Sequence, residues 1–191
     1  MEIDVSSGLL ESAEFVPSPN CDDRPPQEKA RLLIIHNISL PPNEFGGPYI
    51  NQLFTNQLNP QEHPFFEEIH QLRVSSHLLI RRDGSIIQYV PFHKRAWHAG
   101  ISTYENQQAC NDFSIGIELE GADHIPYEPC QYEQLATVTQ ALLKTYPEMS
   151  AEHITGHCDV APERKTDPGE AFDWEHYLGL LAKSSNGEQS T

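Results

Sequence analysis

The chain has 191 residues, and its 28 acidic and 12 basic side chains give a formal net charge of -16 at pH 7. This length is sufficient for one domain with a hydrophobic core of its own. The negative charge repels phosphate backbones and anionic lipid surfaces, so it argues against nucleic acid and membranes as partners.

Targeting signals are missing from the sequence pattern. No apolar run approaches the roughly 18 residues of a membrane-spanning helix. Residues 1–15 carry four acidic side chains where a secretory signal peptide has a basic start. We therefore expect a cytoplasmic protein. Disulfides are rare in that reducing compartment, so free thiols are expected at Cys21, Cys110, Cys130 and Cys158.

The first third of the chain predicts an arm and then a buried strand. Residues 1–30 contain four prolines among polar and acidic residues, and we expect them to form an N-terminal arm. Residues 32–35 are continuously apolar, which is typical of a strand buried on both faces. His36 and Asn37 follow at its carboxyl end, where functional sites are often found. The alternative for His36 is a structural imidazole beside a turn.

The middle of the chain predicts a short helix and a β-hairpin. Helical spacing of apolar residues over 49–57 indicates a helix in a flap near the site. Segments 73–80 and 85–90 flank an Asp-Gly turn, which is a strong hairpin signal. We expect His77 to be a hydrogen-bonded core residue. Trp97 is either a wall of a ligand site or a packing residue.

Residues 113–120 alternate between two kinds of side chain. One face is apolar, and the other consists of Ser114, Gly116, Glu118 and Glu120. Serine and glycine leave space in front of Glu118 for another group or a substrate. One of the two glutamates is therefore a candidate general base, and the alternative is a solvated acidic face.

Two helices are expected in the last third. Apolar residues over 132–146 follow helical spacing, and Pro147 ends the pattern. This helix is expected to cover the sheet. Asp173 is the expected N-cap of a last helix. That helix is expected to fade into a polar tail, residues 184–191, for which we predict disorder.

The loop 156–169 holds the strongest concentration of chemistry in the chain. Its prolines and glycines preclude a long helix, so His157 and Asp167 can turn toward one point. A ring nitrogen and a carboxylate oxygen are two of the three protein ligands of a hydrolytic zinc site, whose fourth position holds water. His36 completes a candidate His/His/carboxylate set.

Six strings in one order carry a resemblance to a known family. They are HNISLPP (36–42), EFGGP (44–48), LLIRRDG (78–84), KRAWHAG (94–100), CNDFSIGIELEG (110–121) and GHCDVAPERKTDPG (156–169). Over residues 15–180 the chain resembles the AmpD family of 1,6-anhydro-N-acetylmuramoyl-L-alanine amidases, zinc enzymes of cytoplasmic peptidoglycan recycling in Gram-negative bacteria. The resemblance implies an α+β (mixed α/β) fold. We expect one amidase domain, residues 31–183, with a central mixed sheet flanked by helices and a zinc site at one edge of the sheet.

The resemblance also implies roles for named residues. One zinc ion per chain is held by His36, His157 and Asp167, while Glu118 transfers protons and Lys165 stabilises the developing oxyanion. The residues implied to line the substrate groove are Asn37, Arg73, Trp97 and Arg164. The implied reaction is hydrolysis of the amide bond between anhydro-N-acetylmuramic acid and L-alanine of a small muropeptide, by a monomer.

Two other interpretations compete with this one. The first is a peptidoglycan-binding module that has the same fold and no catalytic activity. The second is a thiol hydrolase that uses Cys158 beside His157. Adjacent residues of an extended segment point to opposite sides, so a neighbouring Cys-His pair makes a poor dyad.

Overall fold

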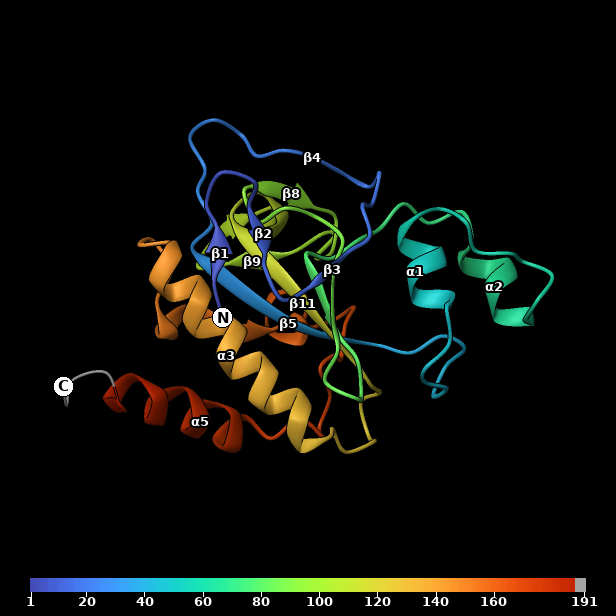
Figure 1. The fold of residues 1–191 in the computed structure, drawn as a ribbon. Helices are drawn as coiled ribbons and strands as arrows, with labels where there is room; N and C mark the ends of the chain where they lie inside the picture. Colours follow the sequence, from blue (N-terminus) through green and yellow to red (C-terminus); the bar gives the residue numbers. More distant parts are fainter. Residues whose placement is uncertain (188–191) are drawn as a thin grey trace.

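The molecule is organised around one mixed β-sheet (Figure 1). A computed structural model describes residues 1–187, with side chains as far as residue 183. The sheet has six strands in the order β12-β5-β11-β6-β7-β3. Neighbouring strands are parallel except for β6 and β7. The strands are β3 (Glu14–Phe15), β5 (Leu32–Ile38), β6 (Leu78–Ile80), β7 (Ile86–Gln88), β11 (Ser114–Glu120) and β12 (Ile154–Gly156). The predicted mixed sheet is confirmed.

The two longest strands form the centre of this sheet. β5 and β11 pair in parallel along their whole length, from Ser114 opposite Leu32 to Glu120 opposite Ile38. Residues 32–35 are fully buried, as their apolar run predicted. Every residue of β11 is also buried, including Glu118 at 9% and Glu120 at 2% exposure. The alternative of a solvated acidic face on this strand is therefore wrong.

Two long helices lie side by side on one face of the sheet (Figure 1). α3 (Pro129–Thr145) and α5 (Trp174–Gly187) bury apolar residues with the sheet in one core. α3 was predicted, but it begins at Pro129, earlier than its apolar spacing indicated. Asp173 caps α5 as predicted, because its Oδ1 accepts a hydrogen bond from the His176 backbone N–H at 2.8 Å. α5 continues to Gly187, into the segment predicted to be a tail, and residues 188–191 lie outside the described part.

Two short helices cover the opposite face of β6 and β7. Leu79 and Ile87 pack in a second core with residues of α1 (Tyr49–Phe54) and α2 (Pro64–Ile69). α1 matches the predicted helix over 49–57 but ends earlier, at Phe54. α2 was not among the predicted helices. Its start has a local signal, because Pro64 occupies the first turn, where a missing N–H costs nothing.

The predicted hairpin and core histidine are both confirmed. β6 and β7 pair antiparallel around the Asp-Gly turn, although each strand has only three residues. Asp83 stabilises the turn, because its Oδ1 accepts the Ser85 backbone N–H at 2.9 Å. His77 is fully buried, its Nδ1 accepts the Gly116 backbone N–H at 3.0 Å, and its Nε2 lies 3.1 Å from the Lys94 carbonyl oxygen.

The N-terminal residues pair with several parts of the domain. β1 (Ile3–Asp4) and β2 (Leu9–Leu10) form a small hairpin, and β3 extends the central sheet at β7. β4 (Cys21–Asp23) pairs antiparallel with β8 (Lys94–Ala96). The remaining short elements are β9 (Thr103–Tyr104), β10 (Gln107–Gln108), η1 (Cys110–Asp112), η2 (Ala151–His153) and α4 (His157–Val160).

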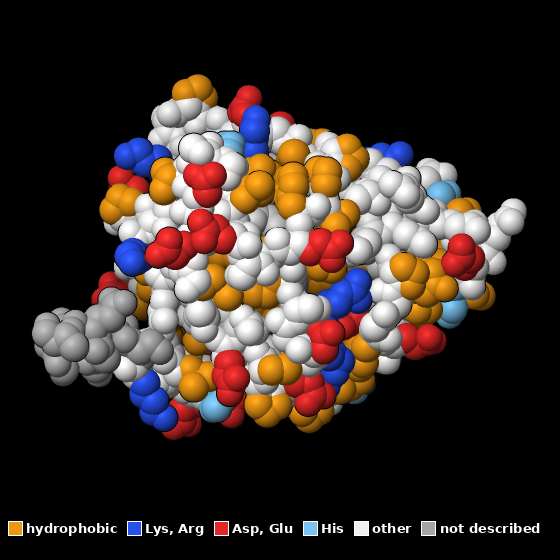
Figure 2. Space-filling view, in the orientation of Figure 1, with side chains coloured by type: hydrophobic (Ala, Val, Ile, Leu, Met, Phe, Trp, Pro, Cys, Tyr) orange, Lys and Arg blue, Asp and Glu red, His pale blue; other side chains and the backbone are white. Residues whose placement is uncertain are grey.

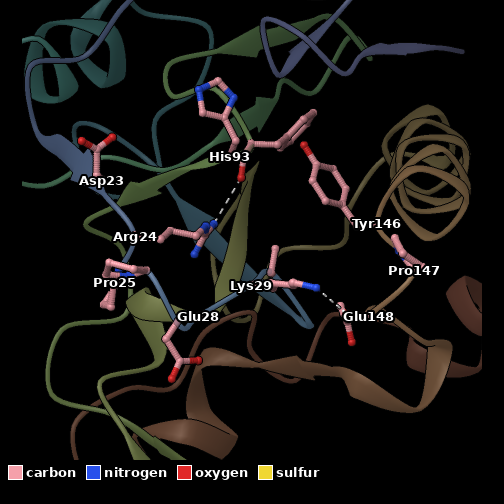
Figure 3. A pocket seen from close by; sticks show the side chains of 12 residues that line it. Asp23, Arg24, Pro25, Glu28, Lys29, His93, Tyr146, Pro147 and Glu148 are labelled. Carbon is pink, nitrogen blue, oxygen red and sulfur yellow. Dashed lines mark hydrogen bonds and ion pairs between the residues drawn. The ribbon is translucent and has the colours of Figure 1, made fainter.

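Arg24, in the N-terminal arm, lines a cavity of about 420 Å³ and binds the arm to the rest of the domain (Figure 3). Its guanidinium donates to the carbonyl oxygens of Asn111 at 3.0 Å and Asp112 at 3.1 Å, and to that of Ser114 at 2.8 Å. Burial lowers the pKa of Arg24 to about 10, so the group stays charged at neutral pH. Because its donors are directed at backbone carbonyls, Arg24 is a structural anchor.

Replacing Arg24 with methionine should lower the free energy of unfolding by about 3 kcal/mol, because several carbonyl oxygens lose a charged donor. Urea denaturation measures the change. Lys29 lines the same cavity and provides the control, since its ion pair with Glu148 is exposed on both sides. Lys29→Ala should cost less than about 1 kcal/mol. Equal effects of the two substitutions would contradict the anchoring role of Arg24.

The surface shows the excess of acidic residues that the composition gives. Acidic side chains are spread over the face shown in Figure 2 and do not gather at one place. None of the helices within residues 1–187 combines the length and the apolar character that crossing a membrane requires. The four cysteines are free thiols.

Candidate metal centre

Three donor atoms from distant parts of the chain meet at the carboxyl ends of β5 and β12. His36 lies in β5, and His157 follows β12, which pairs with β5 so that Gly156 is opposite Ile35. The two Nδ1 atoms are 3.0 Å apart, and Asp167 Oδ2 lies 3.1 Å from His36 Nδ1 and 3.0 Å from His157 Nδ1. All three side chains are buried. The structure thus brings the predicted ligand residues together.

The hydrogen bonds of His157 show that this group suits a cation. Its Nε2 lies 3.0 Å from the carbonyl oxygen of Ala99, which can only accept, so Nε2 carries a proton. In a neutral ring, Nδ1 then presents a lone pair to the carboxylate of Asp167, and two such acceptors need a positive charge between them. Ligands of tetrahedral zinc, with bonds of about 2.0–2.1 Å, are separated by about 3.3 Å. The observed spacings of 3.0–3.1 Å are slightly shorter than this separation.

The electrostatics favour the protonation states that bind metal. Burial lowers the pKa of His36 to about 4, although the hydrogen bond with Asp167 opposes this shift. Burial alone would raise the pKa of Asp167, but the neighbouring rings of His157 and His36 outweigh this effect, and the net shift is downward. At neutral pH the His36 ring is therefore neutral and the Asp167 carboxylate ionised, as zinc ligation requires.

A further histidine, His98, lies within hydrogen-bond distance of the second ring nitrogen of His36. The His36 Nε2 and His98 Nδ1 atoms are 2.9 Å apart, and His98 Nε2 lies 3.2 Å from Ser114 Oγ. Gly116 leaves the space for this ring, since an added Cβ would lie 2.4 Å from His98 Nδ1. Metal-binding histidines commonly have such partners, which fix the tautomer and the ring orientation. This role of His98 was not predicted, although the small residues of β11 were expected to leave space in front of Glu118 for another group or a substrate.

Glu118 and Lys165 lie near enough to the candidate ligands to interact with them electrostatically. Glu118 is opposite His36 in the pairing of β11 with β5. Its Oε2 is buried and has no hydrogen-bond partner among the described residues. Burial and the negative charge of Asp167 raise the pKa of Glu118 well above its ordinary value, and the charge of Lys165 opposes the rise. A buried carboxylate oxygen without a partner is available for a proton.

Two of the predicted substrate residues are bound to the segments that carry the ligands. Asn37 follows His36, and its Nδ2 donates to Asp123 Oδ1 at 2.8 Å and to the Pro168 carbonyl at 3.0 Å. Arg164 Nη2 donates to the carbonyl oxygens of Ala99 at 2.6 Å and Ile101 at 2.9 Å. The Ala99 carbonyl therefore binds both His157 and Arg164.

The other two predicted substrate residues differ in their surroundings. Trp97 precedes His98 in the chain, and its Nε1 donates to Asp22 Oδ1 at 3.2 Å. Arg73 is exposed, and its Nη1 donates to the carbonyl oxygen of Gln71 at 3.3 Å. The hydrogen bonds of Arg73 thus remain within its own segment and do not connect it to the ligand group.

The geometry argues against a thiol nucleophile at Cys158. The expected extended segment is wrong here, because His157 and Cys158 begin the short helix α4. Both ring nitrogens of His157 are engaged, one with Ala99 and the other with the ligand group. Burial and the charges of Asp159 and Asp167 raise the pKa of the Cys158 thiol, which disfavours the thiolate.

Comparisons with known proteins point to one family of amidases. A family model described as N-acetylmuramoyl-L-alanine amidase matches residues 26–170. The chain is 60% identical over 181 residues to 1,6-anhydro-N-acetylmuramyl-L-alanine amidase AmpD of Escherichia coli strain K12, covering 95% of this chain and 98% of that protein. The crystal structure of a selenomethionine AmpD derivative is similar, with a TM-score of 0.91 and 58% identity over 95% of this chain and 99% of that one.

A more distant structure contains a ligand. The complex of the amidase AmiD from E. coli with anhydro-N-acetylmuramic acid-L-Ala-D-gamma-Glu-L-Lys is 26% identical, with a TM-score of 0.56, covering 90% of this chain and 60% of that one. The family model spans most of the chain, and the AmpD relatives match it nearly end to end. The resemblance read from the six strings is thereby confirmed, and the chain belongs to the N-acetylmuramoyl-L-alanine amidase family.

Proposed function

We propose that this amidase hydrolyses the amide bond between 1,6-anhydro-N-acetylmuramic acid and L-alanine of muropeptides, with one zinc ion, during cell-wall recycling. The observation that carries the proposal is the convergence of His36, His157 and Asp167 in a close relative of named AmpD amidases. The monomeric state and the cytoplasmic location expected from the sequence stay predictions.

The donor set is suited to hydrolysis. His36, His157 and Asp167 supply three ligands, which is the number found in catalytic zinc sites. A zinc ion held by these residues would lower the pKa of a bound water toward ~7 and polarise the amide carbonyl. The hydrogen bonds from the ligand rings to His98 and to the Ala99 carbonyl hold both imidazoles in the orientation that turns Nδ1 inward.

Glu118 and Lys165 have complementary parts in this proposal. The free Oε2 of Glu118 accepts the proton of the attacking water and returns it to the amine nitrogen of L-alanine as the amide bond breaks. Lys165 shares a loop with Asp167, and its ammonium group meets the carbonyl oxygen as negative charge develops there. Each group is typically worth on the order of 10²-fold in rate.

The proposed substrate contacts include two arginines. The planar guanidinium of an arginine suits the carboxylates of a stem peptide. Arg164 is held through Nη2 by two carbonyl oxygens, and its Nη1 and Nε have no hydrogen-bond partner among residues 1–183. It can therefore bind a carboxylate without losing its anchor. Asn37, Trp97 and Arg73 complete the proposed set.

Digestion of a purified muropeptide mixture, followed by mass spectrometry, tests the function. The expected products are free stem peptide and anhydro sugar, whose combined mass exceeds that of the substrate by one water. A chelator should abolish cleavage and added zinc should restore it. Cys158→Ser should retain most of the activity, since no hydrogen bond among residues 1–183 joins the thiol to the ligand group. Binding of muropeptides without cleavage would contradict the proposal and favour a non-catalytic module.

A further inference from the structure

We propose that Asn111 is a positioning residue that orients both histidine ligands through one side-chain oxygen. The inference rests on the proposed zinc function. It concerns the loop that follows β8, where His98 and Ala99 provide the outer partners of His36 and His157. Neither the proposed ligands nor the proposed substrate residues include Asn111, and no hydrogen bond among residues 1–183 joins its side chain to the ligand group.

The contacts of Asn111 converge on adjacent residues of this loop. Its Oδ1 accepts the backbone N–H of His98 at 3.1 Å and that of Ala99 at 2.8 Å. His98 then presents its ring to His36, and the two ring nitrogens are 2.9 Å apart. Ala99 presents its carbonyl oxygen to His157 Nε2 at 3.0 Å. One amide oxygen thus determines where both outer partners lie.

The position of Asn111 is itself fixed by the surrounding structure. It lies in the 3-10 helix η1, which begins after Ala109, a residue with a left-handed φ of 62°. The Asn111 carbonyl accepts from Arg24 at 3.0 Å, and the next side chain, that of Asp112, pairs with Arg95 Nη1 at 2.5 Å. The support therefore runs from the N-terminal arm through η1 to the loop and then to the ligands.

This arrangement predicts an effect on metal binding. Without the Asn111 oxygen, two backbone N–H groups lose their acceptor and the loop can relax away from both imidazoles. Loss of an outer-shell partner typically lowers metal affinity by about 10–100-fold. Asn111→Ala affects the partners of two ligands, so it should weaken zinc binding by at least ~10-fold. Asn111→Asp keeps an acceptor oxygen in place and should stay within about threefold of wild type.

Asn20 provides a matched control. It is a buried asparagine whose Nδ2 donates to the carbonyl oxygens of Val74 at 2.8 Å and Phe54 at 3.3 Å, and whose Oδ1 accepts from Asn56 Nδ2 at 3.0 Å. Asn20→Ala therefore also removes hydrogen bonds to the backbone, but these do not involve the partners of the ligands. It should lower the stability of the metal-free protein and leave zinc affinity unchanged.

The experiment measures zinc dissociation constants by competition with a chromogenic chelator, together with urea unfolding of the metal-free proteins. The visible spectrum of the Co²⁺-substituted proteins reports ligand geometry, and it should change in Asn111→Ala but not in Asn20→Ala. If Asn111→Ala does not fold, Asn111→Gln replaces it, because one added methylene displaces the same amide. Wild-type zinc affinity and an unchanged cobalt spectrum in that variant would overturn the inference. A wild-type protein that binds no zinc would instead overturn the proposed function.

Discussion

Replacing His157 with alanine is expected to remove zinc and amidase activity together. The substitution deletes one of three donor atoms that lie 3.0–3.1 Å apart and leaves a single imidazole and a carboxylate. Loss of an outer-shell partner alone costs about 10–100-fold in metal affinity or activity, so loss of a ligand should cost more than about 100-fold. Metal analysis of the purified protein, with about one zinc per chain in the wild type, is measured alongside turnover.

His153 is the control for this experiment. It lies four residues before His157, and its Nδ1 is 3.0 Å from the hydroxyl of Tyr104, away from the ligand group. His153→Ala should therefore retain zinc and turnover. Full zinc occupancy in His157→Ala would show that the ligand assignment is wrong, whatever happens to activity.

Glu118→Gln should separate binding of the metal from its use. The substitution keeps the shape of the side chain but removes a carboxylate whose Oε2 has no partner among residues 1–183. Zinc content and binding of the product should stay near wild type, because Glu118 is not one of the proposed ligands. Single-turnover cleavage should slow by ~10²-fold or more, since the acceptor for the water proton is lost.

Glu120 is a matched control on the same face of β11. Its carboxylate accepts the backbone N–H of Gly46 at 2.7 Å and that of Arg82 at 3.2 Å, so it has the partners that Glu118 lacks. Glu120→Gln should lower stability and leave turnover within about threefold of wild type. Wild-type turnover in Glu118→Gln would refute its role in proton transfer, and loss of zinc would indicate a structural role instead.

The strands that hold the site were readable from local patterns. A continuous apolar run predicts β5 because both of its faces are covered, and the Asp-Gly dipeptide predicts the turn between β6 and β7. Strict alternation also predicts β11, but it does not say what faces its polar side. In the structure that side is occupied by His98 and by buried carboxylates, so the polar residues of β11 belong to the interior.

The chemical types at the site were visible in the sequence. Loop 156–169 showed a histidine and a carboxylate able to converge, and the six strings indicated the family and a third candidate ligand. Which atoms meet depends on how the strands and loops pack. His36 and His157 are 121 residues apart in the chain, and their Nδ1 atoms become neighbours because β12 pairs with β5. The proposed roles of His98 and Asn111 arise in the same way. They consist of hydrogen bonds between separate segments, which no local periodicity encodes because they depend on how the strands and loops pack.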